Sequence, residues 1–112
     1  MPEQMHMSYS VVYARIEREC GLRPVTTAKC NLRTDSTLEK EKSRLGGIAN
    51  DLVFNMTAIK RWGRRNAKNA GYVRIAESYY EQQRCLHLLV VNYLRYMNRL
   101  SQTRLIADSE EN

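Results

Sequence analysis

The side chains best suited to metal or nucleophile chemistry are three cysteines and two histidines. Zinc sites need ligands at short fixed spacings, such as a Cys-x-x-Cys pair or two His one helical turn apart. Cys85 and His87 are two residues apart and would point to different sides of a helix, which also argues against a Cys–His nucleophile pair. The other three lie in separate segments, at Cys20, Cys30 and His6. The spacing therefore predicts neither a metal site nor a catalytic thiol.

Two further catalytic patterns are missing. Glu77 and Glu81 share one helix face, but they lie beside Arg74 and Arg84, which is the arrangement of ordinary surface ion pairs. The Gly-Gly pair at 46–47 lacks the further glycines and the Lys of a phosphate-binding loop. We therefore expect a protein that is not an enzyme, that uses no cofactor or metal, and that acts by binding.

The basic charge is concentrated in one window. The 112 residues include 18 Lys and Arg and 12 Asp and Glu, for a formal net charge of +6. Residues 52–76 contain six basic residues and no acidic one, so the whole excess is local. Such a window is typical of a surface that binds phosphates or an acidic partner, and the alternative is a solvated helix face.

The length predicts one compact helical domain over residues 1–112, with flexible ends at 1–7 and 107–112. The chain begins without the basic and apolar regions of a signal peptide. Its longest apolar run, residues 88–91, is far shorter than the ~20 residues of a membrane helix. An odd number of cysteines favours reduced thiols. We therefore expect no membrane contact and an intracellular location, nuclear in a eukaryote and otherwise cytoplasmic.

Helical spacing of apolar residues organises the chain. A first helix is expected over 8–20, ended by Gly21 and Pro24, and residues 23–35 are expected to form a loop. Ser36 and Glu39 match a capping box that starts a second helix. The Gly pair at 46–47 either kinks this helix or separates two helices.

The strongest helical pattern covers residues 72–105, where apolar residues recur every three or four positions without Gly or Pro. Leu88, Leu89 and Val91 widen its apolar face, and a helix that is apolar on more than one side usually contacts two neighbours. The fold class is therefore predicted to be all-α, a small bundle of about four helices with one long C-terminal helix.

Residues 48–62 resemble the helix-turn-helix of Cro-type phage repressors. In that resemblance Ala49 lies where two helices cross, and Val53 stands at the turn, where Gly is usual. The second helix would place its first side chains against base edges in the major groove and its basic residues against phosphates. Together with the rest of the basic window, the candidate nucleic-acid-binding residues are Asn55, Thr57, Lys60, Arg61, Arg64, Arg65, Lys68 and Arg74.

The long helix is similar to the central helix of GINS subunits, through an Arg-Cys-Leu step at 84–86 and a Tyr-Leu-Arg-x-x-x-Arg-Leu ending at 93–100. The order of helix, loop, capped helix and long helix is also that of the family's helical domain. The resemblance implies a non-enzymatic subunit of a four-member assembly that joins the minichromosome maintenance ring in the replicative helicase. It also implies that the long helix packs against sister subunits. With the widened apolar face, the candidate partner-binding residues are Arg84, Leu88, Leu89, Val91, Tyr93, Leu94, Arg95 and Leu100.

Three functions remain open on these patterns. The first is a GINS-like subunit of a hetero-oligomer, with its basic surface near DNA. The second is a helix-turn-helix transcriptional regulator, which accounts better for the charge. The third is a helical subunit of a ribonucleoprotein particle, which would use the same basic window against RNA phosphates.

Overall fold

The computed structural model describes residues 8–111, and every regular element in that range is a helix. The helices are α2 (Tyr9–Cys20), α3 (Thr27–Cys30), α4 (Leu38–Arg65) and α5 (Ala70–Glu111). The prediction of an all-α bundle with one long C-terminal helix is confirmed. Residues 107–111 continue α5, whereas the flexibility expected for residues 1–7 and 112 lies outside the described residues.

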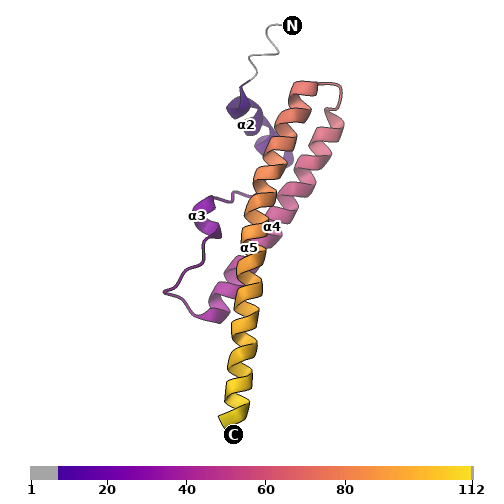
Figure 1. The fold of residues 1–112 in the computed structure, drawn as a ribbon. Helices are drawn as coiled ribbons and strands as arrows, with labels where there is room; N and C mark the ends of the chain where they lie inside the picture. The colour runs from indigo at the N-terminus through magenta and orange to yellow at the C-terminus, as the bar shows by residue number, and fades with distance from the viewer. Residues whose placement is uncertain (1–7, 112) are drawn as a thin grey trace.

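Helices α4 and α5 form a long hairpin in which α5 extends well beyond its partner (Figure 1). With 28 and 42 residues, the two helices are about 42 and 63 Å long. The Nζ atom of Lys42 donates to the hydroxyl of Ser101 at 3.4 Å, and every described side chain after Ser101 is exposed. The molecule measures 73 × 24 × 20 Å, and its radius of gyration of 18.9 Å exceeds the ~13 Å of a compact domain of this length.

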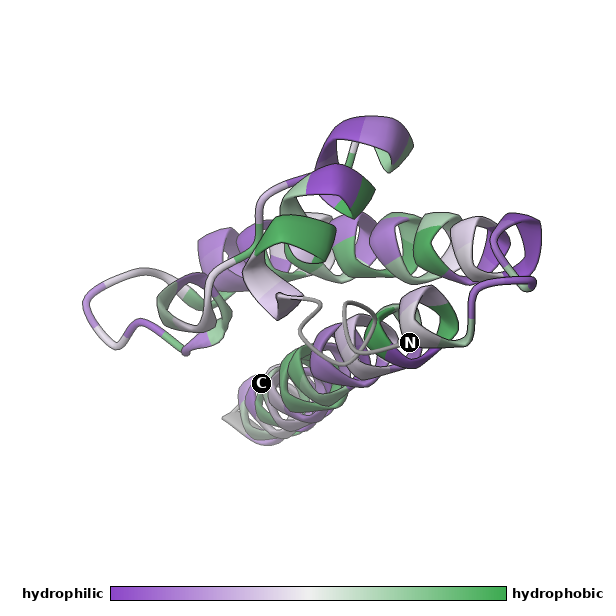
Figure 2. Cartoon of the chain, turned by 90° about the horizontal axis from the view of Figure 1, so that it is seen from above, coloured by the Kyte–Doolittle hydropathy of each residue, from purple (hydrophilic) through white to green (hydrophobic). Residues whose placement is uncertain are grey.

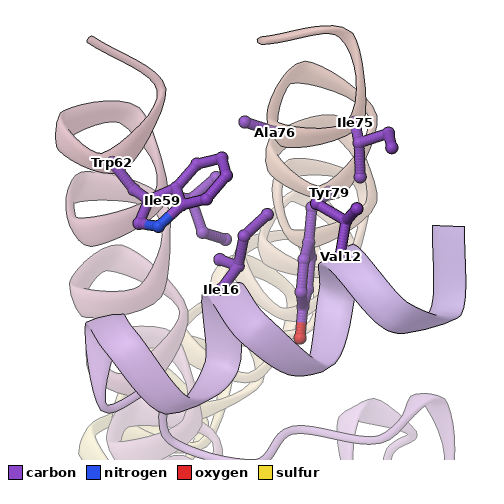
Figure 3. Packing of buried hydrophobic residues seen from close by; sticks show 7 residues of the cluster. All are labelled: Val12, Ile16, Ile59, Trp62, Ile75, Ala76 and Tyr79. Carbon is purple, nitrogen blue, oxygen red and sulfur yellow. The ribbon is translucent and has the colours of Figure 1, made fainter. Parts of the chain in front are cut away.

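Helix α2 covers one side of the hairpin near its closed end. The Gly21 backbone has a φ of +60°, which ends α2 at the expected residue in the left-handed conformation that glycine adopts without strain. Figure 3 shows α2 side chains pointing between α4 and α5. This cluster contains Val12, Ile16, Ile59, Trp62, Ile75, Ala76 and Tyr79. The ring of Tyr13 stacks on that of Tyr79 at 4.2 Å between centroids.

The segment expected to be a loop contains the short helix α3, so that part of the prediction is wrong. The hydroxyl oxygen of Thr26 accepts from the backbone N–H of Lys29 at 3.2 Å and caps the helix. The fully buried Cys30 then joins α3 to the second core cluster, which lies farther along the hairpin. This cluster contains Cys30, Leu45, Ile48, Leu52, Val90 and Met97.

The start of α4 also differs from the expected capping box by one residue. The cap is Thr37, whose hydroxyl oxygen accepts from the backbone N–H of Lys40 at 3.2 Å. The Glu39 carboxylate lies on the helix surface, where its Oε1 atom is 3.9 Å from the Nζ atom of Lys42. Of the two alternatives at Gly46 and Gly47, the separation into two helices is wrong, because α4 continues through both glycines.

The described helices include none that combines the length and the apolar character needed to cross a membrane.

Candidate functional site

The helix-turn-helix interpretation of residues 48–62 is wrong, because these residues lie within the single helix α4. The expected turn at Val53 is absent, and no described residue other than glycine has a positive φ. Without the turn, no separate recognition helix exists to enter a major groove. The physical reason is that the apolar residues of this segment keep one helical stripe, which packs continuously along α5.

Asn55 does not contact solvent, so its predicted role in base reading is also wrong. Its side chain is 1% exposed. Its amide oxygen accepts from the backbone N–H of Arg23, and its amide nitrogen donates to the Arg23 carbonyl, both at 2.8 Å. The same nitrogen donates to the side-chain oxygen of Gln83 at 2.9 Å. Asn55 therefore ties the segment after α2 to the hairpin.

The other seven candidate nucleic-acid-binding residues are all exposed. Thr57 donates its hydroxyl to the Val53 carbonyl within α4, at 2.9 Å. The basic ones lie at the closed end of the hairpin, where α4 ends and α5 begins, and we call them the basic end. They are Lys60, Arg61, Arg64, Arg65, Lys68 and Arg74.

Within residues 8–111, none of the six basic side chains forms an ion pair. The end of α4 and the connection after it are hydrophilic in Figure 2. These six positive charges are therefore not neutralised by neighbouring carboxylates. A surface of this kind attracts phosphates.

Buried contacts hold the basic end in place. Trp62 is fully buried beneath it and donates its indole N–H to a carboxylate oxygen of Glu19 at 3.2 Å. In the connection, the Asn66 side chain donates to the Trp62 carbonyl at 2.9 Å. The Asn69 side-chain oxygen accepts from the backbone N–H of Tyr72 at 3.1 Å and caps α5. The basic side chains therefore project from an ordered support.

A groove of about 540 Å³ lies between α4 and α5 at the basic end. Its apolar lining residues are Ile59, Gly63, Ala67, Val73, Ala76 and Tyr80, of which Ile59 and Ala76 are buried at its base. Sequence reasoning missed this groove. The available signal was the small residues Gly63 and Ala76, which lie opposite each other in the hairpin, where a Cβ atom at Gly63 would be 3.5 Å from that of Ala76.

The candidate partner-binding residues do not form one surface. Leu88 is 47% and Leu100 is 36% exposed, and both charged members, Arg84 and Arg95, are exposed. The Arg84 guanidinium forms an ion pair with the Glu81 carboxylate, with 3.3 Å between the nitrogen and oxygen atoms. Four others, Leu89, Val91, Tyr93 and Leu94, are half-buried, and all of these except Val91 pack against the second core cluster.

The most exposed apolar side chains of α5 were not singled out by the sequence. Leu105 is 69% and Ile106 is 61% exposed, on the part of α5 that extends beyond α4. Apolar residues on a helix that lacks a neighbour are typical of partner-binding surfaces. The projecting end therefore adds two candidates to the partner-binding set.

The three cysteines differ in their exposure to solvent. Cys30 is buried, Cys20 is half-buried and Cys85 is exposed, and none is in a disulfide. No group of three potential ligands from His, Cys, Asp and Glu is present in this range, and His6 lies outside it. Comparison of the chain with protein-family models, with curated proteins and with solved structures found no match.

Proposed function

We propose that the chain is a non-enzymatic binding subunit that holds the phosphate backbone of a nucleic acid at its basic end. The observation that carries this proposal is the group of six exposed basic side chains, which have no ion-pair partner among the described residues. A surface adapted only for solubility would mix charges of both signs. The charged side chains of residues 52–76 are all basic.

The mode of binding is recognition of phosphates rather than of bases. Asn55, the side chain best suited to an adenine edge, is buried in the hairpin. Lys and Arg side chains bind phosphates without regard to sequence. The basic end therefore supports binding to DNA or RNA of any sequence, with an affinity that falls as the salt concentration rises.

The test is fluorescence anisotropy with labelled duplex DNA, single-stranded DNA and single-stranded RNA of about 20 nucleotides. Binding should weaken between about 50 and 200 mM salt, with a log–log slope of at most about −5 for duplex and −4 for single strands if all six side chains contact phosphates. The triple variant Arg61→Gln/Arg65→Gln/Lys68→Gln should flatten this slope by about 2 to 3, because it removes three contacts.

The matched control is Lys40→Gln/Arg95→Gln/Arg99→Gln, which removes three exposed basic side chains elsewhere and leaves the same net charge. This control should bind nearly as well as the unmodified chain. Equal losses in the two triple variants would show general attraction by net charge, and no binding at the lowest salt concentration would refute the proposal.

A second candidate is a protein-bridging subunit of a GINS-like replication assembly. Its support is the exposed apolar surface of α5, at Leu88, Leu100, Leu105 and Ile106. The order of the helices agrees with the layout on which the GINS resemblance rests. Co-expression with the GINS subunits of the same source tests it. Arg95→Glu should weaken a complex without unfolding the chain, and no co-purification of the unmodified chain would reject this candidate.

A further inference from the structure

We infer that the groove between α4 and α5 binds an amphipathic helix of a protein partner, with acidic residues along one flank of that helix and basic residues along the other. This inference goes beyond the proposed function, because it concerns a protein ligand in a groove that shares only Lys60 and Arg64 with the basic end. It starts from the apolar floor of the groove. None of the described lining residues comes from α2 or α3, so the groove is open to a partner.

The two rims of the groove carry opposite charges. Lys60 and Arg64 form the rim on α4, and Glu77 and Glu81 form the rim on α5. All four are exposed, and no ion pair between described residues crosses the groove. A ligand that complements both rims must therefore present acidic groups to α4 and basic groups to α5.

The dimensions suit a helix. The lining residues run from 59 to 67 at the end of α4 and in the connection after it, and from 73 to 81 on α5. The α5 span is about 12 Å or two helical turns long. Two turns of an amphipathic helix present about two or three apolar side chains on one face. A volume of about 540 Å³ lies within the usual range of pockets that bind small molecules, which are comparable in size with two or three apolar side chains.

The acidic rim disfavours nucleic acid in the groove itself. Glu77 and Glu81 would face any phosphate backbone laid along it, at a repulsive cost. Four residues of the basic end do not line the groove and remain for phosphates, namely Arg61, Arg65, Lys68 and Arg74. The opposite charges of the two rims also set the direction of the bound helix. If the bound helix were reversed, its acidic flank would face the acidic rim and its basic flank would face the basic rim.

The test uses three labelled peptides of about 18 residues, long enough to form helix, each with Leu at every third or fourth position. One peptide has Glu along one flank and Lys along the other, the second has Glu on both flanks, and the third has Lys on both. Anisotropy should show the peptide with two signs binding at least about tenfold more tightly than the other two. Equal affinities, or no binding, would overturn the inference.

Two protein variants test the location. Val73→Glu places a charge on the groove floor and should abolish peptide binding, whereas Val11→Glu, at an exposed position on α2, should not change it. Glu77→Lys/Glu81→Lys makes both rims basic and should shift the preference to the peptide with Glu on both flanks. An unchanged preference in this variant would contradict the assignment of the rims.

A further arm separates this inference from the proposed function. The Arg61→Gln/Arg65→Gln/Lys68→Gln variant should bind nucleic acid more weakly and keep its affinity for the peptide. Val73→Glu should lose the peptide and keep its affinity for nucleic acid. A peptide of residues 98–111 of this chain is also tested, because it carries the exposed Leu105 and Ile106. If that peptide binds more tightly than the designed one and the chain self-associates in light scattering, the occupant is a second copy and the inference of a different partner is wrong.

Discussion

The side chains of Asn55 in α4 and Gln83 in α5 form a hydrogen bond of 2.9 Å inside the hairpin. They are 1% and 5% exposed. Asn55 also makes two hydrogen bonds to the backbone of Arg23, so one amide connects three segments. A buried polar group with its partners in place fixes the register of the elements it joins.

Replacing Asn55 with Leu should lower the free energy of unfolding by about 2–3 kcal/mol, because the buried side-chain oxygen of Gln83 and the backbone N–H and C=O of Arg23 would lose their partner. Urea denaturation followed by circular dichroism measures the change. Asn50→Leu is the control, since Asn50 is exposed on the same helix, and it should change stability by less than about 0.5 kcal/mol. Equal effects of the two substitutions would contradict the buried network.

The stripe of α4 that faces the core was visible in the sequence, yet the role of Asn55 was not. Leu52, Asn55 and Ile59 follow the three-and-four spacing of buried positions, so Asn55 lies on the apolar stripe. The same polar residue could equally begin a recognition helix, and local sequence does not distinguish the two. Contact with Gln83, 28 residues later, decides between them.

The long helix α5 could be predicted because it repeats its apolar spacing over many turns, whereas the sequence leaves open whether α4 continues through Gly46 and Gly47. Helix α3 could not, since it has only four residues and is held by Thr26 at its start and by the burial of Cys30 against distant helices. The basic window is visible in the sequence as six basic residues without an acidic one, and the binding role expected of it stays a prediction. Its grouping at one end of the hairpin, and the groove beside it, depend on how α4 packs on α5.

The glycines inside α4 should be replaceable with a gain in stability. Gly46 and Gly47 are helical, and a Cβ atom at either would meet no atom within 4 Å. Gly46→Ala and Gly47→Ala should each raise the free energy of unfolding by about 0.5–1 kcal/mol, because alanine loses less backbone entropy on folding. Thermal unfolding would show a higher Tm for each variant.

Gly21→Ala serves as the opposite control. A Cβ there also meets open space, but the φ of +60° is costly for alanine, so this variant should lose about 1 kcal/mol. A loss of stability in both α4 variants would indicate that the helix is interrupted at 46–47.

The three thiols should react at different rates with a thiol-specific reagent. Cys85 is exposed and should be labelled first. Burial raises the pKa of the Cys20 and Cys30 thiols, which lowers the fraction of reactive thiolate. Cys30 is 0% exposed and should react only when the chain opens. Mass spectrometry of labelled fragments gives the order, and early labelling of Cys30 would contradict its place in the second core cluster.

Glu41 links the start of α4 to the segment after α3. Its carboxylate accepts from the backbone N–H of Arg33 at 2.9 Å and from the Arg44 guanidinium at 2.8 and 2.9 Å. The Arg44 hydrogen bonds, supported by that of Arg33, lower the pKa of Glu41 from its ordinary 4.5 to about 2, although burial acts in the opposite direction. Arg44 also donates to the carbonyls of Lys29 and Asn31, so this pair holds α3 on α4.

Because the folded chain binds the Glu41 proton more weakly than the unfolded chain, this group stabilises the fold above pH 4.5 and loses its effect as the pH falls toward 2. Glu41→Gln should lower the free energy of unfolding by about 1–2 kcal/mol at pH 7, and the difference from the unmodified chain should shrink toward pH 2. Glu39→Gln is the control, since that side chain is 79% exposed, and its effect should be small at every pH. A constant difference between Glu41→Gln and the unmodified chain across this range would show that the ionised carboxylate is not what joins the two segments.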